Sequence, residues 1–259
     1  MTDTYVDVRI EHDVAVLTLN RPDKLNALDV ATRVLLARQI RHFGTSDLVR
    51  GIVLTGTGRA FSAGADLSSV PASYDEFRAA LATFHDLTRA VLETKIPVIA
   101  AVNGIAVGGA SELTLCCDAR IGSPAAEYYQ PENHRGIVIS NASSFLLGRL
   151  VRNHALRIVL GAQRIGADEA LRIGLLDEIV AAPALIPHAV ELIGRWNPDP
   201  RTTALHLSLL RPRPDEIEAA FTREDDAAHD IWESGAFGEG IAGFWADRNA
   251  APTAPATSN

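Results

Sequence analysis

The sequence predicts an α/β fold with mainly parallel strands, followed by a helical C-terminal third. Short apolar runs alternate with segments of helical apolar spacing in the first half of the chain, a pattern typical of parallel sheets with helical connections. From Ser143 onward the apolar spacing is mostly helical. The composition is that of a globular protein, because 47% of the 259 residues are hydrophobic and 22% are charged. At about 150 residues per domain, this length is sufficient for one or two domains.

The N-terminal elements are predicted from two apolar runs and one helix start. Residues 6–10 and 14–19 are rich in apolar side chains and are separated by a short polar segment, which predicts a β-hairpin. Asp29 is a good N-cap residue for a following helix. The apolar residues that indicate an amphipathic helix after it are Val30, Val34, Leu35 and Phe43.

The central elements repeat one order of strand, loop, helix and strand. A strand is predicted over residues 51–55, a helix over 75–93 and a fully buried strand over 97–102, with a Gly-rich loop before the helix. Shorter strands are expected at 119–122 and 178–180. The recurrence favours several turns of one α/β spiral over unrelated segments.

The C-terminal third divides into helices and a tail. We expect the α/β core to occupy residues 1–195 and a helical region to follow over 196–249. Residues 250–259 lack large apolar side chains, so they are expected to form a disordered tail.

The charge balance excludes several classes of partner. Lys and Arg total 24 against 32 for Asp and Glu, giving a net charge of −8, so neither nucleic acid nor an acidic membrane is an expected partner. An anionic ligand therefore needs a local basic patch. The lysines, Lys24 and Lys95, are followed by Leu and Ile, which excludes a P-loop.

The cysteines and the N-terminus predict a cytoplasmic location. Cys116 and Cys117 are adjacent, which suits neither a disulfide nor the spacing of a zinc site, so a reducing compartment is expected. The first ten residues carry charges where a signal peptide would be apolar, and no apolar run reaches the roughly 18 residues of a membrane span.

Other familiar motifs are incomplete. The run from Thr55 has the first two glycines of a dinucleotide fingerprint, but Phe61 occupies the third glycine position. The chain has no Gly-x-Ser-x-Gly elbow and no pair of histidines at metal-ligand spacing. Nicotinamide chemistry, a serine hydrolase and a metal centre are therefore not favoured.

Two Gly-rich segments, residues 60–67 and 103–113, follow apolar strands. Small residues let the backbone approach a ligand closely, and N–H groups at the two strand ends can converge on one developing negative oxygen as an oxyanion hole. The alternative is that these glycines serve only tight turns and close helix-to-sheet packing.

Two carboxylates flank these segments. Glu112 lies three residues after Gly109, in the first turn of an expected helix, and Glu132 follows Gln130-Pro131. One protonated and one ionised carboxyl group at a shared centre can perform general acid and base catalysis. The alternatives are a capping role for Glu112 and simple solvation for Glu132.

The chain, from the hairpin to about residue 248, resembles the enoyl-CoA hydratase/isomerase (crotonase) family. The motifs that carry the resemblance are Asn20-Arg21-Pro22 with Asn26-Ala27-Leu28, the segments 60–67 and 97–104, Gly108-Gly109 with Glu112-Leu113, and Gln130-Pro131-Glu132. The resemblance implies a crotonase-like ββα spiral core with a helical C-terminal trimerisation region. It also implies an acyl-CoA substrate, no additional cofactor, and a homotrimer or dimer of trimers.

The resemblance also assigns roles to individual residues. Ala63 and Gly109 match the residues whose N–H groups hold the thioester oxygen, and Glu112 and Glu132 match the two catalytic glutamates of the hydratases. The residues that match the coenzyme A-binding segments of the family are Lys24, Leu25, Ala65, Asp66 and Leu67. Arg21 and Arg59 are further cations nearby in the sequence.

The segment after the second glutamate departs from the family. Relatives usually read Gly-x-x-Pro-Gly-x-Gly-Gly-Thr there, whereas residues 136–144 keep only Gly136. Ser140 stands where a glycine backbone normally helps position the catalytic water. We therefore expect Ser140 and Asn141 to shape the water site and the acyl pocket.

The function implied is reversible hydration of a 2-enoyl-CoA, because both glutamates are present. Isomerases of the family generally lack the counterpart of Glu112. The alternatives are double-bond isomerisation, another enolate reaction such as dehydration or hydrolysis, and an acyl-CoA-binding protein without catalysis.

Overall fold

Two β-sheets organise the first two thirds of the chain in the computed structural model, which describes residues 5–250. The larger sheet has the strand order β1 (Val6–Glu11), β2 (Val14–Leu19), β3 (Gly51–Gly56), β5 (Val98–Val102), β7 (Ala119–Gly122) and β10 (Glu178–Ile179). The smaller sheet has the order β4 (Ala60–Ser62), β6 (Ile105–Val107), β8 (Glu127–Tyr129) and β9 (Ile165–Gly166).

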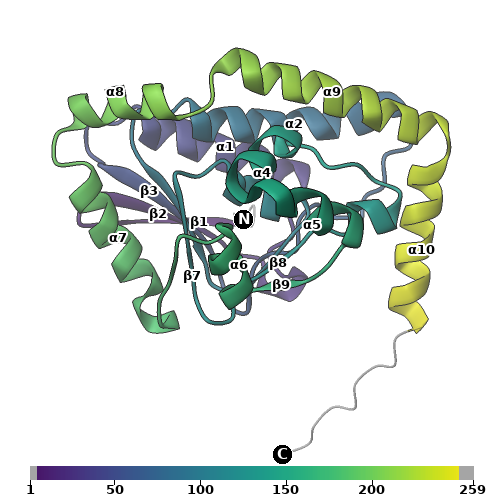
Figure 1. Cartoon of the computed structure of the whole chain (residues 1–259), viewed down its shortest axis with the longest axis horizontal. Coiled ribbons are helices and arrows are strands. Elements are labelled where there is room, and N and C mark those ends of the chain that lie inside the picture. Colours follow the sequence, from purple (N-terminus) through teal and green to yellow (C-terminus); the bar gives the residue numbers. More distant parts are fainter. Residues whose placement is uncertain (1–4, 251–259) are drawn as a thin grey trace, which may run out of the picture.

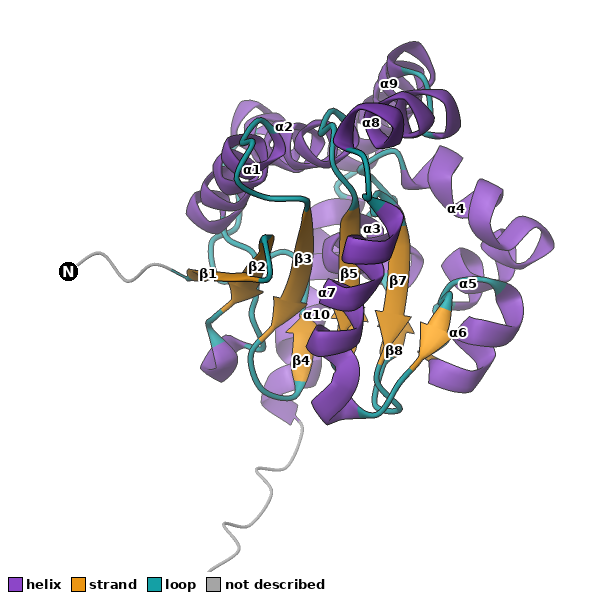
Figure 2. Cartoon of the chain, turned by 90° about the vertical axis from the view of Figure 1, so that its left-hand side faces the viewer, coloured by secondary structure: helices purple, strands orange, loops and turns teal. Residues whose placement is uncertain are grey.

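The strands alternate between the two sheets as a spiral. Strands β3, β5 and β7 pair in parallel in the larger sheet, as Figure 2 shows, and each is followed by a short strand of the smaller sheet. The first two turns then continue into α2 (Tyr74–Leu92) and α3 (Gly109–Leu115), and the third into the 3-10 helix η2 (Glu132–Arg135). This arrangement confirms the predicted α/β class and the ββα spiral.

The central strands of the larger sheet, β3, β5 and β7, are buried on both faces, which explains their continuous apolar runs. On one face, Ile52 and Leu54 of β3 pack in a core with helices α1 (Val30–Gly44) and α2. On the other face, Val53 packs with Ile193 of α7 (Leu185–Trp196). Alternate residues of one strand therefore belong to separate cores, as the period of two requires.

Helix α1 begins where predicted but buries a different face. The Asp29 side chain accepts from Thr32 N at 2.8 Å as an N-cap. Val34, expected on the buried face, is 52% exposed, whereas Leu36 is buried. Arg33 is also buried, because its guanidinium lies 4.1 Å from the centre of the Phe84 ring and donates to a backbone carbonyl of α2. The buried face of α1 therefore includes Arg33, whereas the apolar spacing predicts Val34 there.

The short strands of the smaller sheet were not predicted. Strands β4, β6 and β8 have three residues each, within segments that the sequence analysis treats as loops after longer strands. Three residues do not display a recognisable alternation of apolar and polar side chains. They matter for function because β4 and β6 end at the two Gly-rich segments.

The C-terminal part of the described chain is helical, as predicted. After α7, helices α8 (Pro200–Leu210) and α9 (Pro214–Glu233) run along one side of the molecule and α10 (Ala236–Ala250) turns away from the end of α9 (Figure 1). Helix α10 contacts η2. Helix α10 ends at Ala250, one residue inside the predicted tail, and residues 251–259 lie outside the described part. The remaining elements are η1 (Pro22–Lys24), α4 (Ser143–Val151), η3 (Arg152–His154), α5 (Ala155–Gly161), α6 (Ala167–Ile173), η4 (Ala182–Ala184), α8 (Pro200–Leu210), α9 (Pro214–Glu233) and α10 (Ala236–Ala250).

No helix within residues 5–250 is long and apolar enough to cross a membrane.

Candidate active site

Gly108 connects strand β6 to helix α3 and brings the two glutamates together. Its φ of +50° lies in a region that favours glycine, and a Cβ atom at this position would stand 2.6 Å from Glu132 Oε1. The Glu132 carboxylate therefore lies directly against the backbone that starts α3. Glu112, in the first turn of that helix, is 1% exposed.

Glu132 has a buried carboxylate with an unsatisfied oxygen. Its residue is 8% exposed, and Oε2 has no hydrogen-bond partner in the described structure. Burial raises the pKa of Glu132 to about 7, because water no longer stabilises the charged form. Near neutral pH this carboxyl group can therefore both hold and release a proton.

Glu112, by contrast, receives three hydrogen bonds. Ser140 N donates to Oε1 at 2.9 Å, while the Ser140 hydroxyl and Asn141 Nδ2 donate to Oε2 at 3.1 and 2.6 Å. Burial, followed by the nearby Glu132, raises the pKa of Glu112, and the two Ser140 donors oppose that rise. Ser140 and Asn141, predicted at the water site, are thus in direct contact with one of the two glutamates.

Electrostatic coupling of these buried carboxylates favours a shared proton. Two like charges in a poorly solvated space disfavour simultaneous ionisation, so the pair readily holds one protonated and one ionised group. This is the combination that general acid and base catalysis at one substrate requires.

The structure contradicts Ala63 as an oxyanion donor. Its N–H already donates to the carbonyl of Leu25 at 2.8 Å. The N–H groups of Ala65 and Gly109 have no acceptor within residues 5–250. Gly64 adopts a φ of +80°, and a Cβ on it would collide with the Val107 carbonyl and stand 3.5 Å from Gly109 N. The chain around Ala65 therefore lies beside the start of α3.

Glycine spacing alone does not reveal which N–H of residues 60–67 is already bonded. That depends on the turn after η1, where Leu25 and Asn26 adopt φ values of +50° and +57°. The Asn26 amide donates to the carbonyls of Thr57 and Ala60 at 2.9 Å each, which fixes the turn against the Gly-rich loop.

The predicted coenzyme A residues lie side by side. Leu28 forms a parallel bridge with Ala65, and Ala63 N donates to the Leu25 carbonyl, so residues 25–28 run alongside residues 63–66. Arg21 is engaged in an ion pair with Asp66 at 2.6 Å. Lys24 and Arg59 are exposed.

Glu224 of α9 is a third buried carboxylate, and sequence reasoning did not identify it. It accepts from Ala142 N and from Ser144 N, both at 2.8 Å, and so provides the N-terminal cap that α4 lacks from its own side chains. Its contacts span about 80 residues of sequence, and no local motif signals them.

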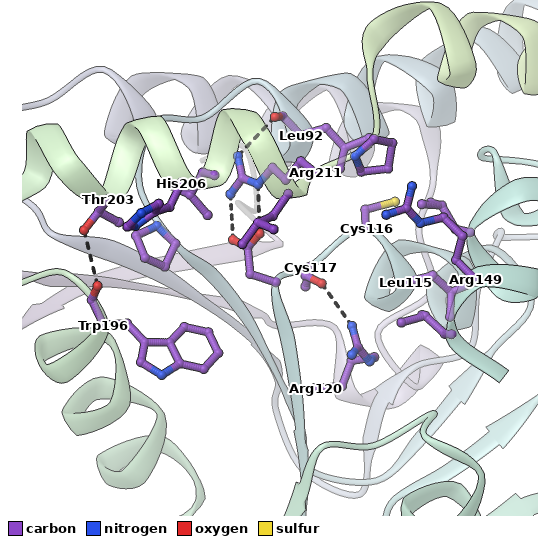
Figure 3. A pocket seen from close by; sticks show the side chains of 17 residues that line it. Leu92, Leu115, Cys116, Cys117, Arg120, Arg149, Trp196, Thr203, His206 and Arg211 are labelled. Atoms are coloured by element: carbon purple, nitrogen blue, oxygen red, sulfur yellow. Dashed lines mark hydrogen bonds and ion pairs between the residues drawn. The ribbon is translucent and has the colours of Figure 1, made fainter.

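A cavity of about 450 Å³ lies elsewhere, between the end of α3, α4 and α8 (Figure 3). Its lining includes both cysteines but none of the predicted site residues, and burial raises the pKa of Cys116 to about 12. Arg211 is anchored there by Asp118 and by the carbonyl of Leu92. No cluster of metal-binding side chains occurs in the part of the chain that the structure describes.

The spiral of ββα turns thus buries two glutamates beside two backbone N–H groups that have no acceptor in the described structure, an arrangement suited to acid–base chemistry. The family model described as enoyl-CoA hydratase/isomerase matches residues 9–251, and the chain belongs to that family.

Similar proteins of known name agree. The chain is 37% identical over 188 residues to a crotonyl-CoA hydratase of Syntrophomonas wolfei, covering 71% of this chain and 72% of that protein. It is 38% identical over 196 residues to a short-chain-enoyl-CoA hydratase of Clostridium acetobutylicum, with the same coverage. Among solved structures, an enoyl-CoA hydratase from Mycobacterium avium subsp. paratuberculosis superposes with a TM-score of 0.81 at 26% identity, covering 96% of this chain and 99% of that one.

Proposed function

We propose that this protein is an enoyl-CoA hydratase that adds water reversibly to a 2-enoyl-CoA. The observation that carries the proposal is the pair of buried glutamates, Glu112 and Glu132, on neighbouring turns of the spiral, with one carboxylate against the backbone that positions the other. Two relatives at 37% and 38% identity are named as hydratases of crotonyl-CoA and of short-chain enoyl-CoA.

The proposed mechanism uses both carboxyl groups. Ionised Glu112 accepts a proton from water as the water oxygen bonds to the β carbon. The electron pair of the double bond moves toward the thioester carbonyl, whose oxygen becomes an enolate oxygen. Protonated Glu132 then gives its proton to the α carbon. A proton passing from Glu112 back to Glu132 restores the starting state.

We propose Gly109 and Ala65 as donors to the enolate oxygen, with Ala65 in place of Ala63. The support is that their N–H groups are free in the described structure, whereas the N–H of Ala63 is already bonded. Preorganised donors of this kind stabilise charge that develops in the transition state. The scheme requires no metal or redox cofactor, because the thioester itself accepts the electrons.

Lys24 and Arg59 are proposed to attract the phosphates of coenzyme A. Both are exposed cations, and Lys24 precedes the segment of residues 25–28 that reaches Ala65. They supply the local positive charge that a net charge of −8 makes necessary.

We also propose a homotrimer or a dimer of trimers in the cytoplasm. Helix α8 supports the assembly, because its Leu205, Leu209 and Leu210 are 65%, 77% and 75% exposed. Exposed apolar side chains of this kind are typical of a subunit interface. Light scattering during size-exclusion chromatography tests this assembly. A protein that remains monomeric at micromolar concentration would contradict it.

The function is tested by incubating the protein with crotonyl-CoA and identifying the product by mass spectrometry. Formation of 3-hydroxybutyryl-CoA supports hydration. Interconversion of 2-enoyl and 3-enoyl thioesters without water addition indicates an isomerase, and release of free acid indicates a hydrolase. Tight binding without turnover would leave only an acyl-CoA-binding role.

A further inference from the structure

The turn at residues 140–142 has an unusual conformation for its composition. Asn141 and Ala142 are consecutive non-glycine residues with φ values of +62° and +59°. Such left-handed residues need support from the surrounding structure. Glu224 supplies that support from α9, since its carboxylate accepts from Ala142 N and Ser144 N.

This conformation directs two side chains at one carboxylate. Asn141 is 1% exposed and its amide nitrogen stands 2.6 Å from Glu112 Oε2, where the Ser140 hydroxyl also reaches at 3.1 Å. With the Ser140 N–H on Oε1, these groups form a set of three donors, which we call the carboxylate donors. They do not contact Glu132, whose Oε2 stays without a partner in the described structure.

The number of hydrogen-bond donors distinguishes the two glutamates, since Glu112 has three and Glu132 Oε2 has none in the described structure. An ionised carboxylate offers about four lone-pair positions, so three carboxylate donors leave about one for the O–H of a water molecule. Donors to the charged form favour ionisation, whereas an unsatisfied buried oxygen favours the neutral acid. The titratable groups that act on the Glu112 carboxylate are Glu132 of η2 and Glu224 of α9, both acidic. The Cys116 thiol donates to the Glu112 backbone carbonyl and to the Thr88 hydroxyl.

We propose that the side chains of Ser140 and Asn141 are positioning residues that stabilise the ionised form of Glu112 against its burial and its acidic neighbours, and direct its remaining lone pair at the attacking water. The proposal rests on the proposed hydratase function. It explains why residues 136–144 depart from the family pattern: their side chains act on Glu112, the proposed base.

Two variants test it, together with a control variant and the conservative variant Ser140→Thr. Ser140→Ala removes the hydroxyl but keeps the backbone donor, and Asn141→Gly removes the amide while relieving the left-handed backbone. Ser208→Ala is the matched control, because Ser208 is exposed on α8 and its hydroxyl donates to the Leu205 carbonyl of its own helix. Thermal denaturation verifies that each variant is folded.

We expect each of the first two variants to lower kcat for crotonyl-CoA hydration by about 10-fold to 100-fold, the range for loss of a hydrogen bond to a charged group, with KM changed less than about 2-fold. The acidic limb of kcat/KM should move to higher pH by about one unit, because Glu112 loses donors to its charged form. Ser140→Thr, which keeps a hydroxyl, should retain more of the wild-type rate than Ser140→Ala, and Ser208→Ala should match the wild type.

Exchange of the α protons of butyryl-CoA in heavy water separates the two glutamates. This exchange uses Glu132 and the oxyanion hole, so we expect Ser140→Ala and Asn141→Gly to retain it. A folded Asn141→Gly protein with wild-type kcat and pH profile would overturn the proposal, and Ser140→Ala decides the question if Asn141→Gly does not fold. If the wild type itself forms no 3-hydroxyacyl-CoA, the hydratase function fails instead.

Discussion

Replacing Gly108 by alanine should disable the enzyme while leaving it folded. The new Cβ would stand 2.6 Å from Glu132 Oε1, whereas ordinary contacts begin at about 3.4 Å, so the carboxylate must move by about 0.8 Å. The atom displaced is the end of a flexible side chain, so the backbone does not have to yield. A displacement of about 1 Å at a reacting group lowers the rate by about 100-fold, which is the loss of kcat expected here.

Gly108→Ala should also lower the free energy of unfolding, by an amount that leaves the protein folded. Alanine at φ +50° and ψ −125° costs about 1–3 kcal/mol of unfolding free energy. At about 2–4 °C per kcal/mol, we expect the melting temperature to fall by roughly 2–12 °C.

The assay is steady-state hydration of crotonyl-CoA, measured well below the melting temperature. Gly194→Ala in α7 is the control, since no atom lies within 4 Å of its future Cβ and alanine favours a helix interior. Wild-type kcat in a folded Gly108→Ala protein would refute the inferred contact between Glu132 and this backbone.

The other predictions concern the three buried glutamates. Glu132→Gln should lower kcat by about 10²-fold to 10⁴-fold with acyl-CoA affinity nearly intact, and near-normal turnover would contradict its role. Glu132 binds its proton more tightly when folded, because its pKa rises from 4.5 to about 7, so unfolding free energy should fall by about 3 kcal/mol as pH rises through that interval. Urea denaturation at several pH values checks this, and the same slope in Glu132→Gln would be evidence against it. Glu112→Ala should abolish hydration but retain exchange of α protons in heavy water, and unchanged hydration would exclude it as the base. Glu224→Gln should destabilise the protein by about 1–3 kcal/mol, because one of its two acceptor oxygens becomes a donor, and denaturation with unchanged stability would show that the cap is dispensable.

Local patterns predicted the parts of the fold that repeat. The apolar runs of β3 and β5 and the Asp29 cap were readable from sequence because each depends on neighbouring residues. The three-residue strands of the smaller sheet were not, because pairing with distant strands determines them. The exposure of Val34 was not predicted, because its neighbour Arg33 packs on the Phe84 ring and occupies the buried face of α1.

The site was predictable to the same extent. Glu112 and Glu132 were found from their motifs, and the structure places them together. Ala63 was wrong because its N–H is bonded by a turn that lies about 40 residues earlier in the chain. The Asn141 contact depends on a left-handed backbone held by Glu224, and no sequence pattern encodes that combination.

The cap from Glu224 makes the proposed active site dependent on a helix that is synthesised after it. Strands β3 to β8, Glu112 and Glu132 precede it by some 90 residues or more, so the spiral can be complete before the 140–142 turn has its support. Exchange of α9 between relatives is therefore not neutral. A chimera whose donor helix has no acid at this position should inherit an intact spiral with a misplaced base, and activity should return when that one carboxylate is restored.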